Sequence, residues 1–488
     1  MTVAVPCTTT PQGARTNLHD KFRGRLVTNE KLDRTLVSFQ ANRKLPCYRW
    51  LKYKEGFSAQ FIEYVIEELA LSPGILLDPF AGTGAALFAA RRLGWDTIGI
   101  ELLPVGFLAI EARVAAESVN PRSLQQEVNK AVEMTWEDFY SPEWRLQHVP
   151  ITRGAFSERT ERAIAGYRAY CSRMANVHLR TLFDLACVSV LESVSYTRKD
   201  GQYLRWDYRA KKDRVTTRFD KGPILDFESA IIQKLRQICD DILRKKNDGS
   251  KGLFGEVRRK PGYLDLRRGS CLNTLPVLPD DSVDLVITSP PYCNRYDYTR
   301  TYALELVYLG ASADDIKALR QSLLSCTVEN RTKREQLRTF YASRNEENAF
   351  ADCLGVFEGQ AALHEALGIL EAYGLADKLN NSNIPNMVRN YFLEMTFVIR
   401  ELARVVRPSG TVVMVNDNVR YAGEEIPVDL ILSSVAESFR LETQRIWTLA
   451  RGKGNSSQQM GAHGRSELRK CVYVWRKSAR IRRATRID

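Results

Sequence analysis

Two short segments of this sequence combine residue types that suit a polar ligand. Residues 288–292 read TSPPY and follow the apolar run SVDLVI. Proline lacks a backbone N–H, so Pro290 and Pro291 must end any strand that carries this run. One interpretation is a simple strand stop. The other is a rigid loop whose carbonyl groups and flanking side chains, Ser289 and Tyr292, face a flat polar group.

The second segment, DPFAGTG, places Gly82 and Gly84 between a short apolar run and an alanine-rich one. Such a loop can make a tight turn alone, or it can present helix-start N–H groups to a polar ligand. A dinucleotide site needs a third glycine where Leu87 stands, and a P-loop needs a Lys-Ser/Thr pair that does not follow. Glu101 ends the next apolar run, where a carboxylate can accept both ribose hydroxyls. Asp78 and Glu101 therefore indicate a nucleoside cofactor without a phosphate site.

Regular elements must hold these segments in place. The apolar spacing in FSAQFIEYVIEELAL predicts a helix with Ser58 as its N-cap. A buried strand over Ile75–Leu77, a helix ending near Gly94 and a second strand over Thr97–Ile100 complete a predicted βαβ unit.

The rest of the chain predicts one doubly wound α/β domain with two largely helical insertions. Its last segments, RLETQRIWTLA and RKCVYVWRK, predict a closing pair of strands. The predicted segments are a loose N-terminal arm, 1–45; the part with the glycine loop, 46–114; a first insertion, 115–260; the part with TSPPY, 261–310; a second, helical insertion, 311–385; the C-terminal part, 386–477; and a basic tail, 478–488.

The composition favours a nucleic-acid partner and gives no sign of a metal centre. The chain has 488 residues, 44% of them hydrophobic, and a formal net charge of +13. That charge favours a polyanionic partner. The ten cysteines form no CxxC pair and no Cys/His cluster, so we expect no metal and a reducing compartment. We find no signal-peptide pattern and no run of the ~18 apolar residues that a membrane span needs, and we expect a cytoplasmic protein.

Together, DPFAGTG, GIE and TSPPY resemble the motifs of amino-group methyltransferases that use S-adenosylmethionine, most closely the DNA cytosine-N4 and adenine-N6 enzymes. The resemblance covers about residues 50–113, 262–310 and 390–477. It implies a Rossmann-like methyltransferase sheet, S-adenosylmethionine as cofactor and double-stranded DNA as substrate. It also implies a companion restriction endonuclease, with which this chain would form a restriction–modification pair.

The resemblance further implies which residues bind the cofactor. Asp78, Phe80, Ala81, Gly82 and Gly84 would surround its methionine half, and Glu101 would hold its ribose. The segment YKEGFS is similar to the one that cradles the methionine carboxylate in these enzymes, which adds Tyr53, Phe57 and Ser58. Ser270 stands where the family often has an acid that contacts the adenine.

In this interpretation Ser289, Pro290, Pro291 and Tyr292 form the catalytic loop. The Ser289 hydroxyl and the Pro290 carbonyl would accept the two hydrogens of an exocyclic amine and hold its nitrogen near-tetrahedral. Tyr292 would stack on a base flipped out of the duplex. Serine at position 289 favours cytosine N4, because the adenine-N6 enzymes more often have Asp or Asn there. Cys293 is expected to be a small buried residue, since Tyr292 separates it from the prolines that precede a cytosine-C5 nucleophile.

A basic and aromatic segment is the first candidate for DNA contact. Between Tyr196 and Lys221 there are nine Lys or Arg against four Asp, with aromatic residues interleaved. Such a mixture suits phosphate contact and base stacking, although a solvated charged face is the alternative. The residues predicted to contact DNA are Arg198, Lys199, Arg205, Lys211 and Lys212, with Arg295 beyond the catalytic loop. RTKREQLRTFYASR in the second insertion is another candidate.

Three other functions stay open at this point: adenine-N6 methylation by the same residues, RNA methylation, and DNA binding without catalysis. We see no appended RNA-binding module, which disfavours RNA. The presence of Gly82, Gly84, Glu101 and Ser289 together argues against an inert protein.

Overall fold

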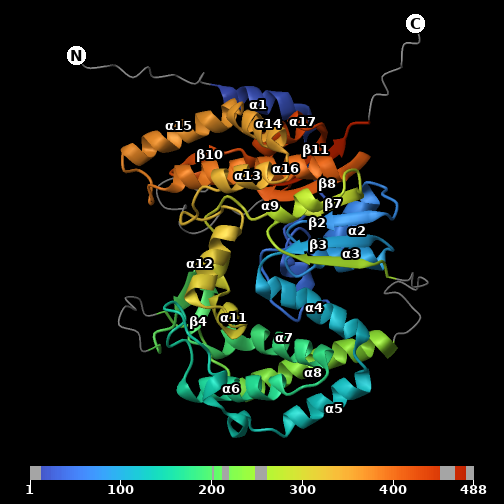
Figure 1. The fold of residues 1–488 in the computed structure, drawn as a ribbon, viewed down its shortest axis with the longest axis vertical. Helices are drawn as coiled ribbons and strands as arrows, with labels where there is room; N and C mark the ends of the chain where they lie inside the picture. Colours follow the sequence, from blue (N-terminus) through green and yellow to red (C-terminus); the bar gives the residue numbers. More distant parts are fainter. Residues whose placement is uncertain (1–12, 201–202, 211–218, 248–260, 451–467, 480–488) are drawn as a thin grey trace.

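An eight-stranded, mostly parallel sheet lies at the centre of the computed structural model (Figure 1). The structure describes residues 13–200, 203–210, 219–247, 261–450 and 468–479. The strands, in spatial order, are β1 (Leu26–Asn29), β11 (Leu441–Leu449), β12 (Lys470–Lys477), β8 (Val406–Asp417), β7 (Val283–Thr288), β2 (Ile75–Asp78), β3 (Asp96–Glu101) and β6 (Leu264–Arg268). In this sheet β12 runs antiparallel to β11 and β8, and the other neighbours are parallel. The predicted α/β class is confirmed.

The predicted βαβ unit is present. Helix α2 (Ala59–Glu68) begins at Ser58, whose side chain accepts a hydrogen bond from the Phe61 N–H. Strand β2, helix α3 (Ala85–Arg92) and strand β3 follow, and β2 pairs with β3 in parallel. The predicted closing strands are β11 and β12, which pair with each other.

Side chains that alternate along the strands build hydrophobic layers on both faces of the sheet. Val412 and Met414 of β8 join the cluster that contains α16 (Ile384–Val405) and α17 (Val428–Ser438). Val413 and Val415 point to the opposite face and join the cluster that contains α2 and α3. This period of two is what a strand buried on both faces requires.

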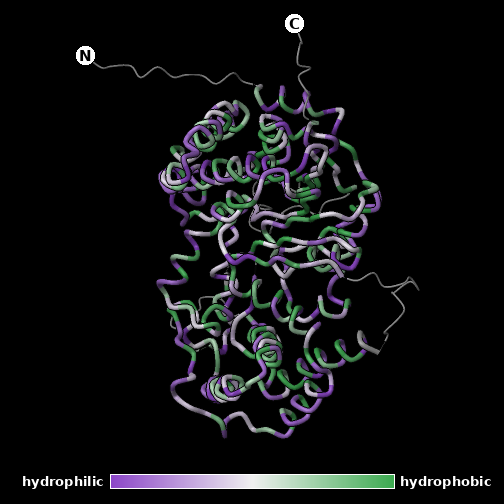
Figure 2. The backbone as a smooth tube through the Cα atoms, turned by 45° about the vertical axis from the view of Figure 1, so that its right-hand side comes forward, coloured by the Kyte–Doolittle hydropathy of each residue, from purple (hydrophilic) through white to green (hydrophobic). Residues whose placement is uncertain are grey.

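A second hydrophobic core lies below the sheet in Figure 1 and is mainly helical. It is built by α4 (Pro104–Ser118), α5 (Pro121–Val132), α6 (Glu158–Ser172), α7 (Val177–Val194), α8 (Phe227–Asn247) and α11 (Ala303–Tyr308). The antiparallel hairpin of β4 (Thr197–Asp200) and β5 (Tyr203–Trp206) lies in the same body. Figure 2 shows hydrophobic segments in both halves of the molecule.

The helices of residues 313–375 divide between these two bodies. Helix α12 (Ala313–Ser322) lies between the two halves in Figure 1. Helices α13 (Arg334–Ala342), α14 (Glu347–Glu358) and α15 (Ala361–Leu375) join the cluster around α16. A buried ion pair anchors this region, since Lys333 Nζ lies 2.8 Å from Glu394 Oε1 of α16.

The expectation of a loose N-terminal arm is wrong for the part that the structure describes. Helix α1 (Ala14–Phe22) buries Leu18 and Phe22 in the core beside α15 and α17. Strand β1 then pairs in parallel with β11 and forms one edge of the sheet. A mostly polar composition hid two apolar side chains that are one helical turn apart, and burying them orders the segment.

The described residues contain no helix that is both long and apolar enough to cross a membrane. The same part of the chain has no group of three or more His, Cys, Asp or Glu arranged to hold a metal ion.

Candidate active site

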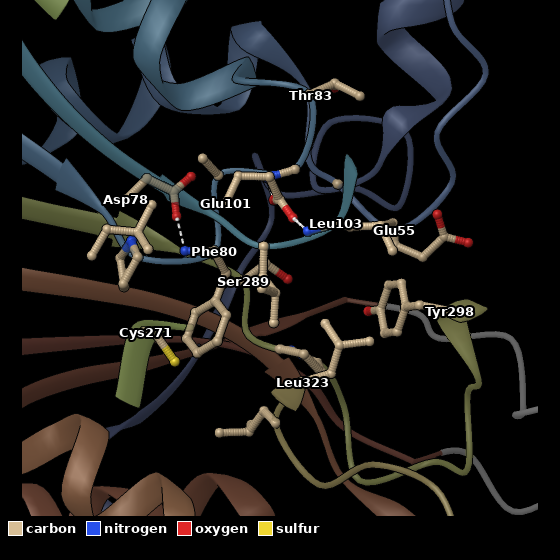
Figure 3. A pocket seen from close by; sticks show the side chains of 18 of the residues that line it. Glu55, Asp78, Phe80, Thr83, Glu101, Leu103, Cys271, Ser289, Tyr298 and Leu323 are labelled. Atoms are coloured by element: carbon tan, nitrogen blue, oxygen red, sulfur yellow. Dashed lines mark hydrogen bonds between the residues drawn. The ribbon is translucent and has the colours of Figure 1, made fainter. Parts of the chain in front are cut away.

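A pocket lies at the carboxyl ends of the central strands (Figure 3). Strand β2 is followed across the sheet by β3 and β6, whereas its other neighbour β7 leads to β8. Ligand crevices form at such a switch point. Of the residues predicted to bind the cofactor, those that line this pocket are Tyr53, Phe57, Asp78, Phe80, Ala81, Gly82, Glu101 and Ser270, joined by Ser289 and Pro291 of TSPPY.

The Glu101 carboxylate fixes the glycine loop to the end of β3. It accepts hydrogen bonds from the backbone N–H of Gly82, at 2.6 Å, and of Leu103, at 2.6 Å. Burial raises the pKa of Glu101 to about 7, although these two hydrogen bonds act in the opposite direction. The side chain therefore lies in the pocket as an acceptor that burial makes easy to protonate.

Asp78 joins the glycine loop to the TSPPY segment. Its Oδ1 accepts from the Phe80 N–H at 3.1 Å and from the Thr288 hydroxyl at 2.7 Å. Burial raises the pKa of Asp78 to about 7 against these hydrogen bonds. The two loops named by the sequence motifs are thus in direct contact through one carboxylate.

Aromatic side chains and a further carboxylate line the pocket on the side of Tyr53. The Tyr53 ring stacks on the Tyr302 ring, with centroids 5.2 Å apart and an interplanar angle of 17°. Glu55 accepts hydrogen bonds from the hydroxyls of Tyr296 and Tyr302. Figure 3 shows Glu55 near Tyr298 on the side of the view opposite Asp78.

In the TSPPY loop Ser289 is the polar side chain that lines the pocket. Its hydroxyl donates to the Tyr292 hydroxyl at 3.4 Å, and burial raises the pKa of Tyr292. The Tyr421 hydroxyl donates to the carbonyl of Cys293 and braces the loop from the β9–β10 hairpin (Val419–Tyr421 and Glu424–Ile426). Cys293 is fully buried, as expected, and burial raises the pKa of its thiol well above the ordinary range.

Four predicted site residues do not line the pocket. Ser58 is buried as the N-cap of α2 and donates to the Leu36 carbonyl at 2.6 Å. Gly84 is the N-cap of α3 with φ +74°, and it lies against Phe88 and Ile110. Pro290 and Tyr292 are not among the lining residues, although their chain neighbours Ser289 and Pro291 are. Ser58 and Gly84 therefore support the helices that flank the pocket.

The structure also adds residues that the sequence did not single out. Glu55 and Tyr298 line the pocket, and Thr288 donates to Asp78 beside it. Glu55 lies inside YKEGFS, and Thr288 and Tyr298 lie in or just after TSPPY, so the sequence indicated their segments but not their side chains. Residues 322–324 line the pocket from the second insertion, where no motif marked them. Gly106 of α4 gave no signal at all, yet a Cβ there would lie 2.5 Å from the Gly82 carbonyl oxygen.

Comparison with known proteins identifies the family. The chain is 43% identical over 462 residues to the type II methyltransferase M.AvaI of Nostoc sp. (strain PCC 7120), covering 94% of this chain and 92% of that protein. M.AvaI of Anabaena variabilis gives the same values. The type II methyltransferase M.BsoBI of Geobacillus stearothermophilus is 40% identical over 482 residues, which are 96% of this chain and 92% of that protein. This chain belongs to the type II DNA methyltransferases. No family model matches it.

The residues of this methyltransferase that were predicted to contact DNA differ in their exposure to solvent. Residues alternate along β4, so Arg198 is exposed while Lys199 is 7% exposed and points inward. Lys199 Nζ pairs with Glu305 at 2.5 Å and lies 4.2 Å from the centre of the Tyr302 ring. The expectation that Lys199 contacts DNA is therefore wrong, because its charge is already paired inside the protein.

The other residues predicted to contact DNA have different neighbours. Arg205 pairs with Asp200 and lies over the Phe219 ring at 4.0 Å. Arg295 donates to Asn380 at 2.7 Å. Lys211 and Lys212 lie outside the described residues.

Substituting Gly106 tests the close packing of α4 on the glycine loop. In Gly106→Ala the new methyl group would lie 2.5 Å from the Gly82 carbonyl oxygen and 3.1 Å from Glu101 Cδ. We expect a melting temperature several degrees lower and DNA methylation reduced at least tenfold, because backbone atoms must shift.

The matched control is Gly355→Ala in α14, where nothing lies within 4 Å of the added Cβ. This variant should be as stable as the parent or slightly more stable, since alanine favours a helix. Equal behaviour of the two variants in thermal unfolding would contradict the packing argument.

The two buried carboxylates predict a pH dependence of stability in the absence of ligands. Asp78 and Glu101 have pKa values of about 7 when folded, against ordinary values of 3.8 and 4.5. Between these limits the folded state binds more protons than the unfolded state, so the free energy of unfolding falls as pH rises from about 4.5 to 7. Glu101→Gln should make this fall less steep in denaturant titrations, whereas Glu63→Gln, an exposed carboxylate of α2, should not. An unchanged slope in Glu101→Gln would contradict the raised pKa.

Proposed function

We propose that this chain transfers a methyl group from S-adenosylmethionine to the N4 amino group of cytosine, in a base flipped out of double-stranded DNA. One observation carries the proposal: Ser289 of TSPPY and Glu101 beside the glycine loop line one pocket at the switch point of the sheet. A nucleoside-binding carboxylate and an acceptor for an amine are thereby within one cavity.

The composition of the pocket supports S-adenosylmethionine as the cofactor. Its lining residues include Phe80, Ile100 and Leu102, which suit a purine ring, and Glu101, which suits ribose hydroxyls. None of the lining residues is Lys or Arg, as expected for a nucleoside cofactor without phosphate groups. When bound, S-adenosylmethionine supplies an electrophilic methyl group on a sulfonium ion.

The chain's own residues would prepare the amine. The Ser289 hydroxyl and the Pro290 carbonyl act as acceptors for the two amino hydrogens, and the two prolines hold them rigidly. Thr288 ties this loop to Asp78 and so keeps the amine site in register with the glycine loop. The buried thiol of Cys293 cannot serve as a nucleophile, which supports direct attack by the amino nitrogen.

The β4–β5 hairpin supports a DNA-binding surface. Arg198 lies directly opposite Arg205 in the register of the two strands. Like charges in cross-strand positions destabilise a hairpin, so a partner that supplies negative charge would relieve their repulsion. We propose that these two arginines contact phosphates near the flipped base.

We also propose a cognate restriction endonuclease as a functional partner. The proteins that this chain matches over most of their length are named type II methyltransferases. Methylation by this chain would then protect the recognition sites that the endonuclease cleaves.

Mass spectrometry of nucleosides tests the reaction. Unmethylated plasmid DNA is incubated with the protein and S-adenosylmethionine carrying a deuterated methyl group, and the digest is analysed. We expect labelled N4-methylcytosine, and at least a hundredfold less with Ser289→Ala, because the variant removes one of the two acceptors on the amine.

A variant of a second serine serves as the control for this test. Ser322→Ala alters another serine of the pocket and should keep most of the activity. Labelled N6-methyladenine would overturn the choice of base while retaining the cofactor and site. Absence of label from DNA, with label in RNA or in neither, would overturn the proposed function.

Removing charge from the hairpin tests the DNA surface. Each lost phosphate contact lowers the slope of log K against log[salt] by about 0.9. Arg198→Ala should therefore weaken DNA binding and reduce the salt slope by about one unit. Arg122→Ala, an exposed arginine at the start of α5, should change neither quantity. An unchanged slope with Arg198→Ala would exclude the hairpin from the interface.

A further inference from the structure

Glu55 is a carboxylate of the pocket that has no role in the proposed methyl transfer. It lines the same cavity as Glu101 and Ser289. Within the described residues it forms no ion pair with Lys, Arg or His. Burial lowers the pKa of the neighbouring Lys54, although the charge of Glu55 acts in the opposite direction, and the Lys54 ammonium donates to the carbonyl of Lys199 at 3.2 Å.

Two tyrosines hold this carboxylate in a fixed position. The Tyr296 hydroxyl donates to Oε1 of Glu55 and the Tyr302 hydroxyl donates to Oε2. Tyr302 is itself fixed, because its ring is stacked on Tyr53 and lies under the Lys199 ammonium. Glu55 is therefore a preorganised acceptor and not a mobile surface side chain.

The charges of the pocket residues indicate which group of the cofactor Glu55 contacts. Asp78, Glu101 and Glu55 contribute three carboxyl groups, and no lining residue carries a positive charge. Asp78 and Glu101 already accept backbone N–H groups, whereas the donors to Glu55 are two hydroxyls. The cofactor carries an ammonium and a carboxylate on the same carbon of its methionine half. A carboxylate placed against Glu55 would be repelled, and an ammonium would be attracted.

We propose that Glu55 binds the α-ammonium group of the cofactor's methionine half. The inference rests on the proposed function, and it changes the role of the YKEGFS segment from holding the methionine carboxylate to holding the ammonium. Tyr296 and Tyr302 are positioning residues, since they act through Glu55.

Calorimetric binding to four nucleosides separates the two ends of the amino acid. S-adenosylmethionine and S-adenosylhomocysteine carry ammonium and carboxylate, decarboxylated S-adenosylmethionine carries ammonium alone, and 5′-methylthioadenosine carries neither. Glu55→Gln should weaken binding of the first three at least tenfold and change that of methylthioadenosine less than twofold, because a charge-assisted hydrogen bond is lost only where an ammonium is present.

Two variants serve as controls. Glu63→Gln removes an exposed carboxylate that pairs with Arg92 on the outside of α2, and it should leave all four affinities unchanged. Tyr302→Phe keeps Glu55 but removes one of its donors, and it should weaken the three ammonium-bearing ligands by a smaller factor than Glu55→Gln.

The other outcomes are distinct. Equal weakening of all four ligands by Glu55→Gln would show a structural role and overturn the inference. Tighter binding of S-adenosylhomocysteine, with decarboxylated S-adenosylmethionine unchanged, would show that Glu55 faces the carboxylate. Failure of the unmodified protein to bind any of the four would overturn the proposed cofactor itself.

A further comparison uses only the unmodified protein and so does not require that any variant folds. The unmodified protein should bind S-adenosylhomocysteine at least tenfold more tightly than the analogue that lacks its amino group. Equal affinities would overturn the inference.

Discussion

The hydrogen bond from the Thr288 hydroxyl to Asp78 Oδ1 spans 2.7 Å and joins the ends of two neighbouring strands. The pocket depends on this constraint, because β2 leads into the glycine loop and β7 leads into the TSPPY loop. The two loops are far apart in the sequence, and the sheet brings their first residues to adjacent positions. A buried carboxylate with a hydroxyl and an N–H as partners then fixes one loop relative to the other.

The helical body is also connected to the pocket, through a second set of buried contacts. Lys199 reaches from the β4–β5 hairpin to Glu305 and the face of Tyr302, and Tyr302 in turn contacts both Tyr53 and Glu55. The hairpin that carries the exposed Arg198 is thus connected to the wall of the pocket by buried contacts. Lys199 is buried in making this contact, because residues along β4 alternate between buried and exposed positions.

Sequence patterns predicted the parts of this molecule in which local chemistry sets local structure. Ser58 at a helix start, the buried strand before Asp78 and the glycine loop follow from spacing alone, and each has a place in the fold. Prediction failed where a residue's role depends on contacts from elsewhere. Ser58 and Gly84 have helix-capping positions and do not reach the pocket, and Lys199 is one position away from an exposed site. Gly106 matters only because α4 crosses the glycine loop, which no local pattern records.

Strand β1 pairs with β11, so the first strand of the sheet and nearly the last one form its edge together. The ribosome synthesises Leu26–Asn29 long before Leu441–Leu449. The N-terminal segment must therefore wait, unpaired, while the central strands form, and such distant pairing is slow. Completion of this sheet edge must therefore follow the synthesis of all the segments between the two strands, and it joins two parts of the chain that are far apart in the sequence.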